Sequence, residues 1–180
     1  MALGHDVVQY LTHRYLLHSS NKKMMRLLRH SVHHTTTASR GISACYMSSG
    51  DFFLEIILPY LVPLILVGGG GVDIRFHYLV AGLGSMGGVY EHSGYDFGVL
   101  LQSLGEQSNS MDKAKDSKLH VPLSLTWILG GILDNRSHGE HHAQANVSFA
   151  DGFGSPGICD TLFGTRFNLS QGKRALRDKE

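Results

Sequence analysis

The most apolar part of the chain is a run over residues 52–67, which is followed by four glycines at 68–71 and a second apolar stretch over 72–90. A helix that crosses a bilayer needs about 20 apolar residues, so the first run is slightly short for a span, and Glu55 interrupts it. The second stretch contains several small residues, which permit close helix packing in lipid. The pattern predicts a membrane helical hairpin, with the buried hairpin of a soluble protein as the alternative.

A helical pattern of apolar positions also covers residues 5–18 at the start of the chain. Two histidines in this segment, His13 and His18, are five residues apart, which is about 140° around an ideal α-helix. Their side chains therefore converge only if the helix ends near His18 or contains a π-turn, a feature that often marks functional sites.

Polar segments separate the apolar elements. Residues 35–50 predict a loop that is rich in threonine, serine and glycine, and residues 105–118 predict a mobile polar loop or insertion. Residues 121–133 form a further apolar run that is too short to span a bilayer. We expect an all-α protein, a membrane helical bundle without a sizeable sheet, with one domain over residues 1–167 and a polar tail over 168–180.

Composition and charge narrow the function classes. A length of 180 residues suits a single domain, and a net charge of +1 gives no electrostatic case for nucleic acid. The two cysteines, Cys45 and Cys159, lie far apart, which argues against a disulfide framework or a cysteine zinc site. Four basic residues between 22 and 29 indicate the cytosolic side if they lie beside a membrane, or else an ordinary solvated face.

Histidine is the outlier of the composition, with 12 residues. Two triplets share the spacing His-x-x-His-His: His30, His33 and His34, and then His138, His141 and His142. On a helix this spacing places three imidazoles on one face, and imidazole suits zinc, copper, iron or nickel. Together with His13 and His18 the rings are too many for one tetrahedral zinc, which takes about four ligands. Two metal ions in one histidine-rich shell fit better.

Other residues are candidates by their position. His92 follows the second apolar stretch, so it lies at the mouth of the predicted hairpin, within reach of the same metals. Carboxylates near the histidines are candidates to orient the ring nitrogens that face away from the metals. These are Asp6, Glu91, Glu140 and Asp151. The chain has no His-Glu-x-x-His motif, which argues against a hydrolytic zinc enzyme.

In chain order, these motifs resemble those of the fatty acid hydroxylase/sterol desaturase superfamily. The resemblance covers nearly the whole chain and rests on His13 to His18, the two His-x-x-His-His boxes, Glu91-His92-Ser93-Gly94-Tyr95 and a closing segment over 153–165. One box alone is a weak signal, whereas all of them in order are specific.

The resemblance implies a multi-pass protein of the endoplasmic reticulum membrane whose histidine boxes face the cytosol. Its two iron ions, which zinc can replace in a purified form, would activate O₂ to hydroxylate or desaturate a lipid, either a fatty acyl chain or a sterol. The electrons would come from NAD(P)H through a b-type cytochrome or its reductase. The ligands that it implies are His13, His18, His30, His33, His34, His92, His138, His141 and His142; His5, His77 and His120 match nothing.

The chain also departs from the family pattern. Members usually have one or two membrane helices before the first box, whereas this chain starts almost at that box. We therefore expect a shortened chain or a reduced anchor, and a non-catalytic metal-binding remnant of the same fold is the alternative function. The five-residue step from His13 to His18 is closer to the fatty acid hydroxylase branch than to the sterol desaturases, which typically use four.

Overall fold

The computed structural model describes residues 1–68, 73–112, 123–153 and 155–167, and this part of the chain is helical without any strand. The elements are α1 (Ala2–Thr12), the π-helical turn η1 (His13–Leu17), α2 (Lys22–Leu28), α3 (His30–His34), the 3₁₀ turn η2 (Gly41–Cys45), α4 (Ser49–Phe52), the π-helical turn η3 (Phe53–Ile57), α5 (Leu58–Leu66), α6 (Ile74–Glu91), α7 (Phe97–Asp112), α8 (Leu123–Ile132), α9 (Arg136–Gln144) and α10 (Ile158–Leu162). The prediction of an all-α fold is confirmed.

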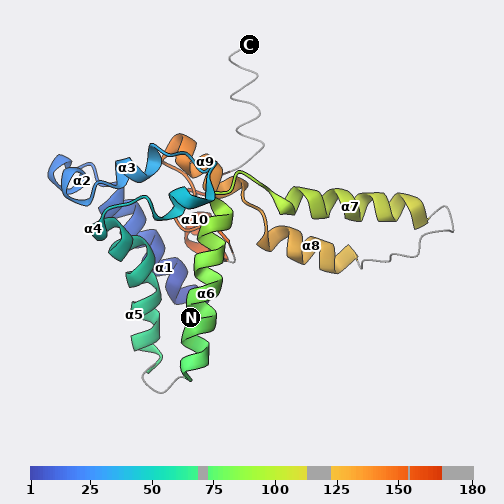
Figure 1. Cartoon of the computed structure of the whole chain (residues 1–180), viewed down its shortest axis with the longest axis horizontal. Helices are drawn as coiled ribbons and strands as arrows, with labels where there is room; N and C mark the ends of the chain where they lie inside the picture. Colours follow the sequence, from blue (N-terminus) through green and yellow to red (C-terminus); the bar gives the residue numbers. More distant parts are fainter. Residues whose placement is uncertain (69–72, 113–122, 154, 168–180) are drawn as a thin grey trace, which may run out of the picture.

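The helices extend from one crowded end of the molecule. Figure 1 shows α5 and α6 running side by side away from the end where α2, α3 and α9 lie, with α1 beside them. In the same view α7 and α8 form a separate pair that projects to the side. The segments that carry the histidine boxes therefore gather at one end of the long helices, as the sequence predicts.

One helix among the described residues, Ser49–Leu66, is long and apolar enough to cross a membrane. It runs continuously through α4, η3 and α5, and it begins before the predicted apolar run. The reason is a helix cap: the Ser48 hydroxyl accepts a hydrogen bond from the Asp51 amide at 3.1 Å, which satisfies an amide that the first turn leaves free. The cap converts the last residues of the predicted loop over 35–50 into helix.

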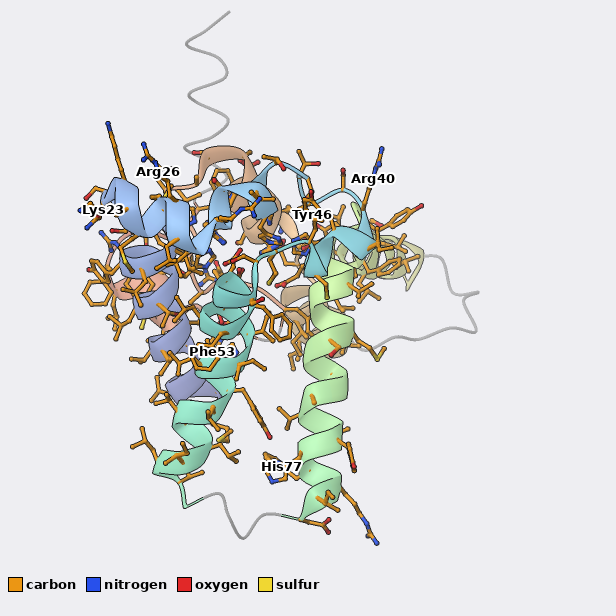
Figure 2. All side chains as sticks on the ribbon, turned by 60° about the vertical axis from the view of Figure 1, so that its left-hand side comes forward. Lys23, Arg26, Arg40, Tyr46, Phe53 and His77 are labelled. Carbon is orange, nitrogen blue, oxygen red and sulfur yellow. The ribbon has the colours of Figure 1, made fainter. Side chains whose placement is uncertain are left out.

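The apolar helix packs against α1 on one side. Gly4 lies so close to Pro63 that a methyl group at Gly4 would sit 2.8 Å from the proline ring, so the two helices meet where a side chain is missing. On the other side Figure 2 shows His77 pointing from α6 toward α5, where its Nδ1 lies 2.6 Å from the hydroxyl of Tyr60. Large apolar side chains of α5 and α6, Leu66 and Met86 among them, remain exposed, as on a surface that faces lipid.

The C-terminal segment closes over α1. Tyr10 packs with Phe149 and Cys159 in a small buried core. Asp6, which is fully buried, accepts hydrogen bonds from the amides of Ile158 at 3.0 Å and Cys159 at 2.9 Å. A carboxylate at these amides caps α10 and complements its dipole. Asp6 thus ties the first helix of the chain to the last.

The predicted polar loop over 105–118 is wrong in its first half, because α7 continues as a helix to Asp112. Its remainder and the predicted tail over 168–180 lie outside the described residues. The backbones of α7 and α8 approach closely at Gly98, where a methyl group would lie 2.6 Å from the carbonyl oxygen of Gly130.

We expect Asp6→Ala to lower the free energy of unfolding by about 1–3 kcal/mol, because the substitution leaves the buried amide of Cys159 and the partly buried amide of Ile158 without their acceptor. Chemical denaturation in mixed micelles measures the change. Glu140→Ala is the matched control, since among the described residues Glu140 bonds only to Gln144 on an exposed face of α9. Equal stability of the two variants would contradict the capping role.

Candidate metal centre

The π-turn after α1 brings the first two histidines together. In η1 the amide of His18 donates to the carbonyl of His13 at 2.9 Å, a bond across five residues. The wider turn places the two imidazoles on the same side, with ring centroids 5.0 Å apart. The convergence of His13 and His18 through a π-turn is confirmed.

The second box lies on α3, which is separated from α2 by a single residue in the left-handed conformation, Arg29 at φ 54°. This reversal redirects the chain, so α3 can turn one face to the interior. His30 and His34 are one turn apart and point into one group of rings, while His33 points into a neighbouring group. The box therefore divides its imidazoles between two positions.

The first group contains five histidines, His13, His18, His30, His34 and His141, whose ligand nitrogens all lie within 4.8 Å of one another. Its centre is the Nε2 atom of His30, which lies 3.0 Å from Nε2 of His34 and 3.1 Å from that of His13. The Nε2 atom of His18 lies 3.2 Å from those of both His30 and His141.

The second group contains His33, His92 and His142, again within 4.8 Å of one another. His92 Nε2 lies 3.2 Å from His33 Nε2 and 3.3 Å from the Nε2 of His138, which adds a fourth ring. The two groups adjoin, because the rings of His34 and His142 have centroids 4.6 Å apart. All nine histidines that the sequence singles out thus lie in one cluster.

Backbone carbonyls fix the direction of several rings. The Nδ1–H of His13 donates to the carbonyl of Phe149 at 2.7 Å, and that of His141 donates to the carbonyl of Val147 at 2.6 Å. His92 donates in the same way to a carbonyl in the last turn of α6 at 2.9 Å. A carbonyl only accepts, so each ring carries its proton on Nδ1 and turns the lone pair of Nε2 inward.

This arrangement fits metal ions. Lone pairs of neighbouring Nε2 atoms face one another, and a cation placed between them removes their repulsion and uses each as a ligand. Both ring nitrogens of the buried His142 have no hydrogen-bond partner among the described residues. A buried polar group without a partner is costly, and coordination supplies the missing interaction.

Burial and crowding keep the rings neutral. Burial is the largest cause that lowers the pKa of His13, His18, His33, His34, His92, His138, His141 and His142. Neighbouring histidines lower it further at most of these positions, to a pKa of about 3 for His18 and His33 and about 4 for His34. Neutral imidazole is the form that binds metals, so the clustered rings are already in the protonation state that coordination requires.

The four carboxylates that the sequence suggested for orienting these rings have other partners. Asp6 caps α10, and Glu91 accepts from the amide of Phe153. Glu140 bonds to a glutamine one turn away on α9, while Asp151 pairs with an arginine at 2.8 Å. None of the four accepts a hydrogen bond from a histidine ring among the described residues, so the structure assigns them to holding the C-terminal segment and α9.

Two carboxylates that sequence reasoning missed do face the cluster. Asp51 lies 2.8 Å and Glu55 3.5 Å from the Nδ1 of His30, and all three side chains are almost completely buried. Burial lowers the pKa of His30, but the hydrogen bond to Asp51 and the charges of both carboxylates outweigh it and raise that pKa. The available signal was an acidic pair four residues apart in an otherwise apolar helix.

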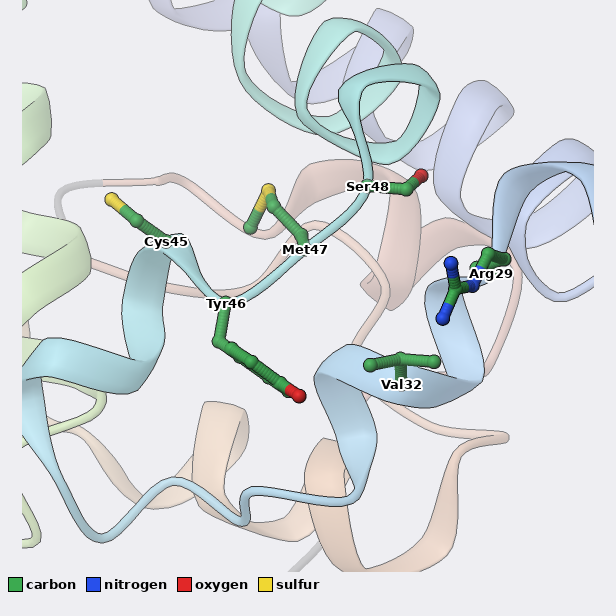
Figure 3. A pocket seen from close by; sticks show the side chains of 6 residues that line it. All are labelled: Arg29, Val32, Cys45, Tyr46, Met47 and Ser48. Atoms are coloured by element: carbon green, nitrogen blue, oxygen red, sulfur yellow. The ribbon is translucent and has the colours of Figure 1, made fainter.

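The remaining histidines lie apart from the cluster. His5 is exposed on α1 and His77 contacts Tyr60, whereas His120 lies outside the described residues. A cavity of about 200 Å³ adjoins the second box on the side of η2. Figure 3 shows its lining of Arg29, Val32, Cys45, Tyr46, Met47 and Ser48. This volume is below that of usual small-molecule sites, so the cavity is no pocket for a lipid chain.

A family model described as fatty acid hydroxylase matches residues 1–165, which include every histidine of the cluster. The chain belongs to the fatty acid hydroxylase family. No curated protein and no solved structure matches it significantly. Fatty acid hydroxylases are typically membrane-bound lipid hydroxylases or desaturases of the non-haem di-iron type, which agrees with a histidine-rich cluster beside an apolar helix.

We expect the metal-free protein to lose stability as the pH falls from 7.5 to 5. The folded-state pKa values of eight clustered histidines lie below the ordinary value of about 6.5, so the unfolded chain takes up protons first. Each such group lowers the unfolding free energy by up to about 1.4 kcal/mol per pH unit below that value. His30, with its raised pKa, acts in the opposite direction.

Unfolding midpoints measured across this pH range test the expectation. His77→Gln, a change at a histidine outside the cluster, should retain the same pH dependence. A midpoint that stays constant from pH 7.5 to 5 would show that the rings titrate freely in the folded protein.

Proposed function

We propose that the protein is a membrane oxygenase that hydroxylates or desaturates a lipid with O₂ and electrons from NAD(P)H, and that its nine clustered histidines hold two iron ions. The observation that carries the proposal is the pair of adjoining imidazole groups, with inward Nε2 atoms 3.0–3.3 Å apart. The alternative of one independent metal in each box conflicts with the arrangement, because each box contributes to both groups.

The nine histidines would be divided between the two ions. His13, His18, His30, His34 and His141 would hold one ion, and His33, His92, His138 and His142 the other. Bound iron with nitrogen ligands and open positions supplies the oxidising power needed to attack an unactivated C–H bond. The protein's own part is to keep the rings neutral, to fix their direction through Nδ1–H bonds and to exclude bulk water by burial.

A lipid is the substrate class that the surroundings support. The exposed apolar side chains of α5 and α6 lie on helices that lead to the cluster, so an acyl chain or a sterol would approach from the bilayer along these helices. Hydroxylation and desaturation share the first hydrogen abstraction, and both outcomes belong to the proposal.

The opposite face supports a cytosolic orientation in the endoplasmic reticulum membrane. No acidic residue occurs between Asp6 and Asp51, whereas Lys23, Arg26 and Arg40 are exposed there. Figure 2 shows these three side chains pointing away from α5 and α6. Basic residues favour the cytosolic side, and a positive face attracts an acidic partner. A b-type cytochrome or its reductase would deliver electrons at this face.

We expect the wild-type chain in detergent to bind two Fe²⁺ or Co²⁺ ions, and His33→Ala to bind fewer with a changed spectrum of the remaining ion, because the two groups share a boundary. Metal analysis and Co²⁺ absorption spectra measure both effects. His77→Ala, which removes a histidine outside the cluster, should bind as the wild type does. One full-affinity ion with an unchanged spectrum in His33→Ala would show two independent sites and remove the main support for the oxygenase.

We expect the double change Lys23→Glu and Arg26→Glu to slow reoxidation of a reduced b-type cytochrome by about tenfold at low salt, because it reverses the charge where the partner would dock. Stopped-flow absorbance measures the rate, and the difference should shrink at high ionic strength. Arg75→Glu is the control, since Arg75 is exposed at the far end of α6. Equal slowing by both variants would place the docking surface elsewhere.

A further inference from the structure

The apolar helix Ser49–Leu66 carries two charged residues, Asp51 and Glu55, and both are buried at the end that meets the metal centre. Hydrogen bonds through Ser48 connect the backbone of Asp51 to the end of α2. The Asp51 amide donates to Ser48, whose hydroxyl in turn donates to the carbonyl of Leu28 at the end of α2. The carboxylate therefore enters the cluster from a fixed backbone.

His30 is the clustered histidine that these two side chains contact. Its Nδ1 lies 2.8 Å from Asp51 and 3.5 Å from Glu55, while its Nε2 is the centre of the five-histidine group. The other rings of the cluster that have a partnered Nδ1 among the described residues, those of His13, His92 and His141, donate to backbone carbonyls. His30 thus differs from them, because its acceptor is a side-chain carboxylate.

Stability alone gives no reason for this pair. Burying carboxylates costs several kcal/mol unless they are fully paired, and replacing such groups by apolar ones is often neutral or stabilising. Among the described residues, Asp51 Oδ2 and Glu55 Oε2 have no hydrogen-bond partner. The other buried carboxylates, such as Asp6 and Asp160, are satisfied by amides.

Charge balance provides the reason. Nine neutral imidazoles carry no charge to offset divalent cations, and a buried cation interacts strongly with nearby negative charge. A carboxylate that accepts a ring N–H also orients the imidazole and increases the basicity of its other nitrogen. Asp51 and Glu55 are placed to do both at one of the two metal positions.

We propose that Asp51, supported by Glu55, is a positioning residue for His30, and that it makes the metal position of the five-histidine group more electron-rich than its neighbour. The inference rests on the proposed function, since it assumes that the cluster holds metals. Asp51 accepts the Nδ1–H of His30 and fixes its Nε2 toward the ion. The two metal positions are therefore unequal.

The experiment uses the full chain in detergent micelles, with Co²⁺ titration and redox titration of the iron-loaded protein. In Asp51→Asn, which retains an acceptor oxygen and loses the charge, we expect one of the two Co²⁺ ions to bind about 10- to 100-fold more weakly. The reduction potential of one iron should rise. Asp51→Glu, which restores the charge, should recover part of both effects, and Glu140→Gln should leave both unchanged.

Several outcomes would overturn the inference. One is wild-type affinity for both ions and wild-type potentials in Asp51→Asn. Another is equal weakening of both ions together with a lower unfolding midpoint of the metal-free variant, which would reveal a purely structural role. Failure of the proposed function looks different, because the wild-type chain itself would then not bind two ions.

Discussion

The centre depends on one constraint: crowded neutral imidazoles that turn Nε2 toward a shared site must carry their protons on the outer nitrogen, Nδ1. The Nε2 atoms face one another at 3.0–3.3 Å. Their lone pairs are free to bind cations only if each ring carries its proton on the outer nitrogen. The carbonyls of Phe149 and Val147 accept two of these protons. Asp160 holds this loop by accepting from the amides of Phe149 and Ala150 at 2.9 and 2.7 Å. A short C-terminal segment thereby orients His13, which is distant in sequence, and His141.

The same constraint explains why the boxes interleave. A His-x-x-His-His box on a short helix places its first and last rings one turn apart, and the middle ring is rotated from both. When two such helices approach, rings of both boxes surround each position. The pairs His34–His142 and His33–His142 have centroids 4.6 and 4.8 Å apart, so the boundary between the groups is itself made of ligand candidates.

The sequence predicts those features of the site that depend on spacing along one segment. The five-residue step from His13 to His18 predicted a helix end or a π-turn, and the structure has a π-turn. The carboxylate partners depend instead on contacts between distant segments. Asp6 lies near His13 in sequence, yet its carboxylate accepts hydrogen bonds from amides of α10. The Nδ1–H of His13 already donates to the carbonyl of Phe149, so this ring needs no carboxylate. Spacing alone could not reveal that Asp51, on another helix, would reach His30.

The long helices and the metal centre form one unit. α1 ends in the turn that carries His13, α6 ends one residue before His92, and the apolar helix begins with the turn that carries Asp51. Each of these three helices thus contributes a group to the cluster or to the carboxylates behind it. Packing of α1 on α5, close at Gly4 and Pro63, therefore fixes distances within the metal site. Under the proposed function, a lipid that moves along these helices would meet the centre at their shared end, where the rings are buried and already oriented.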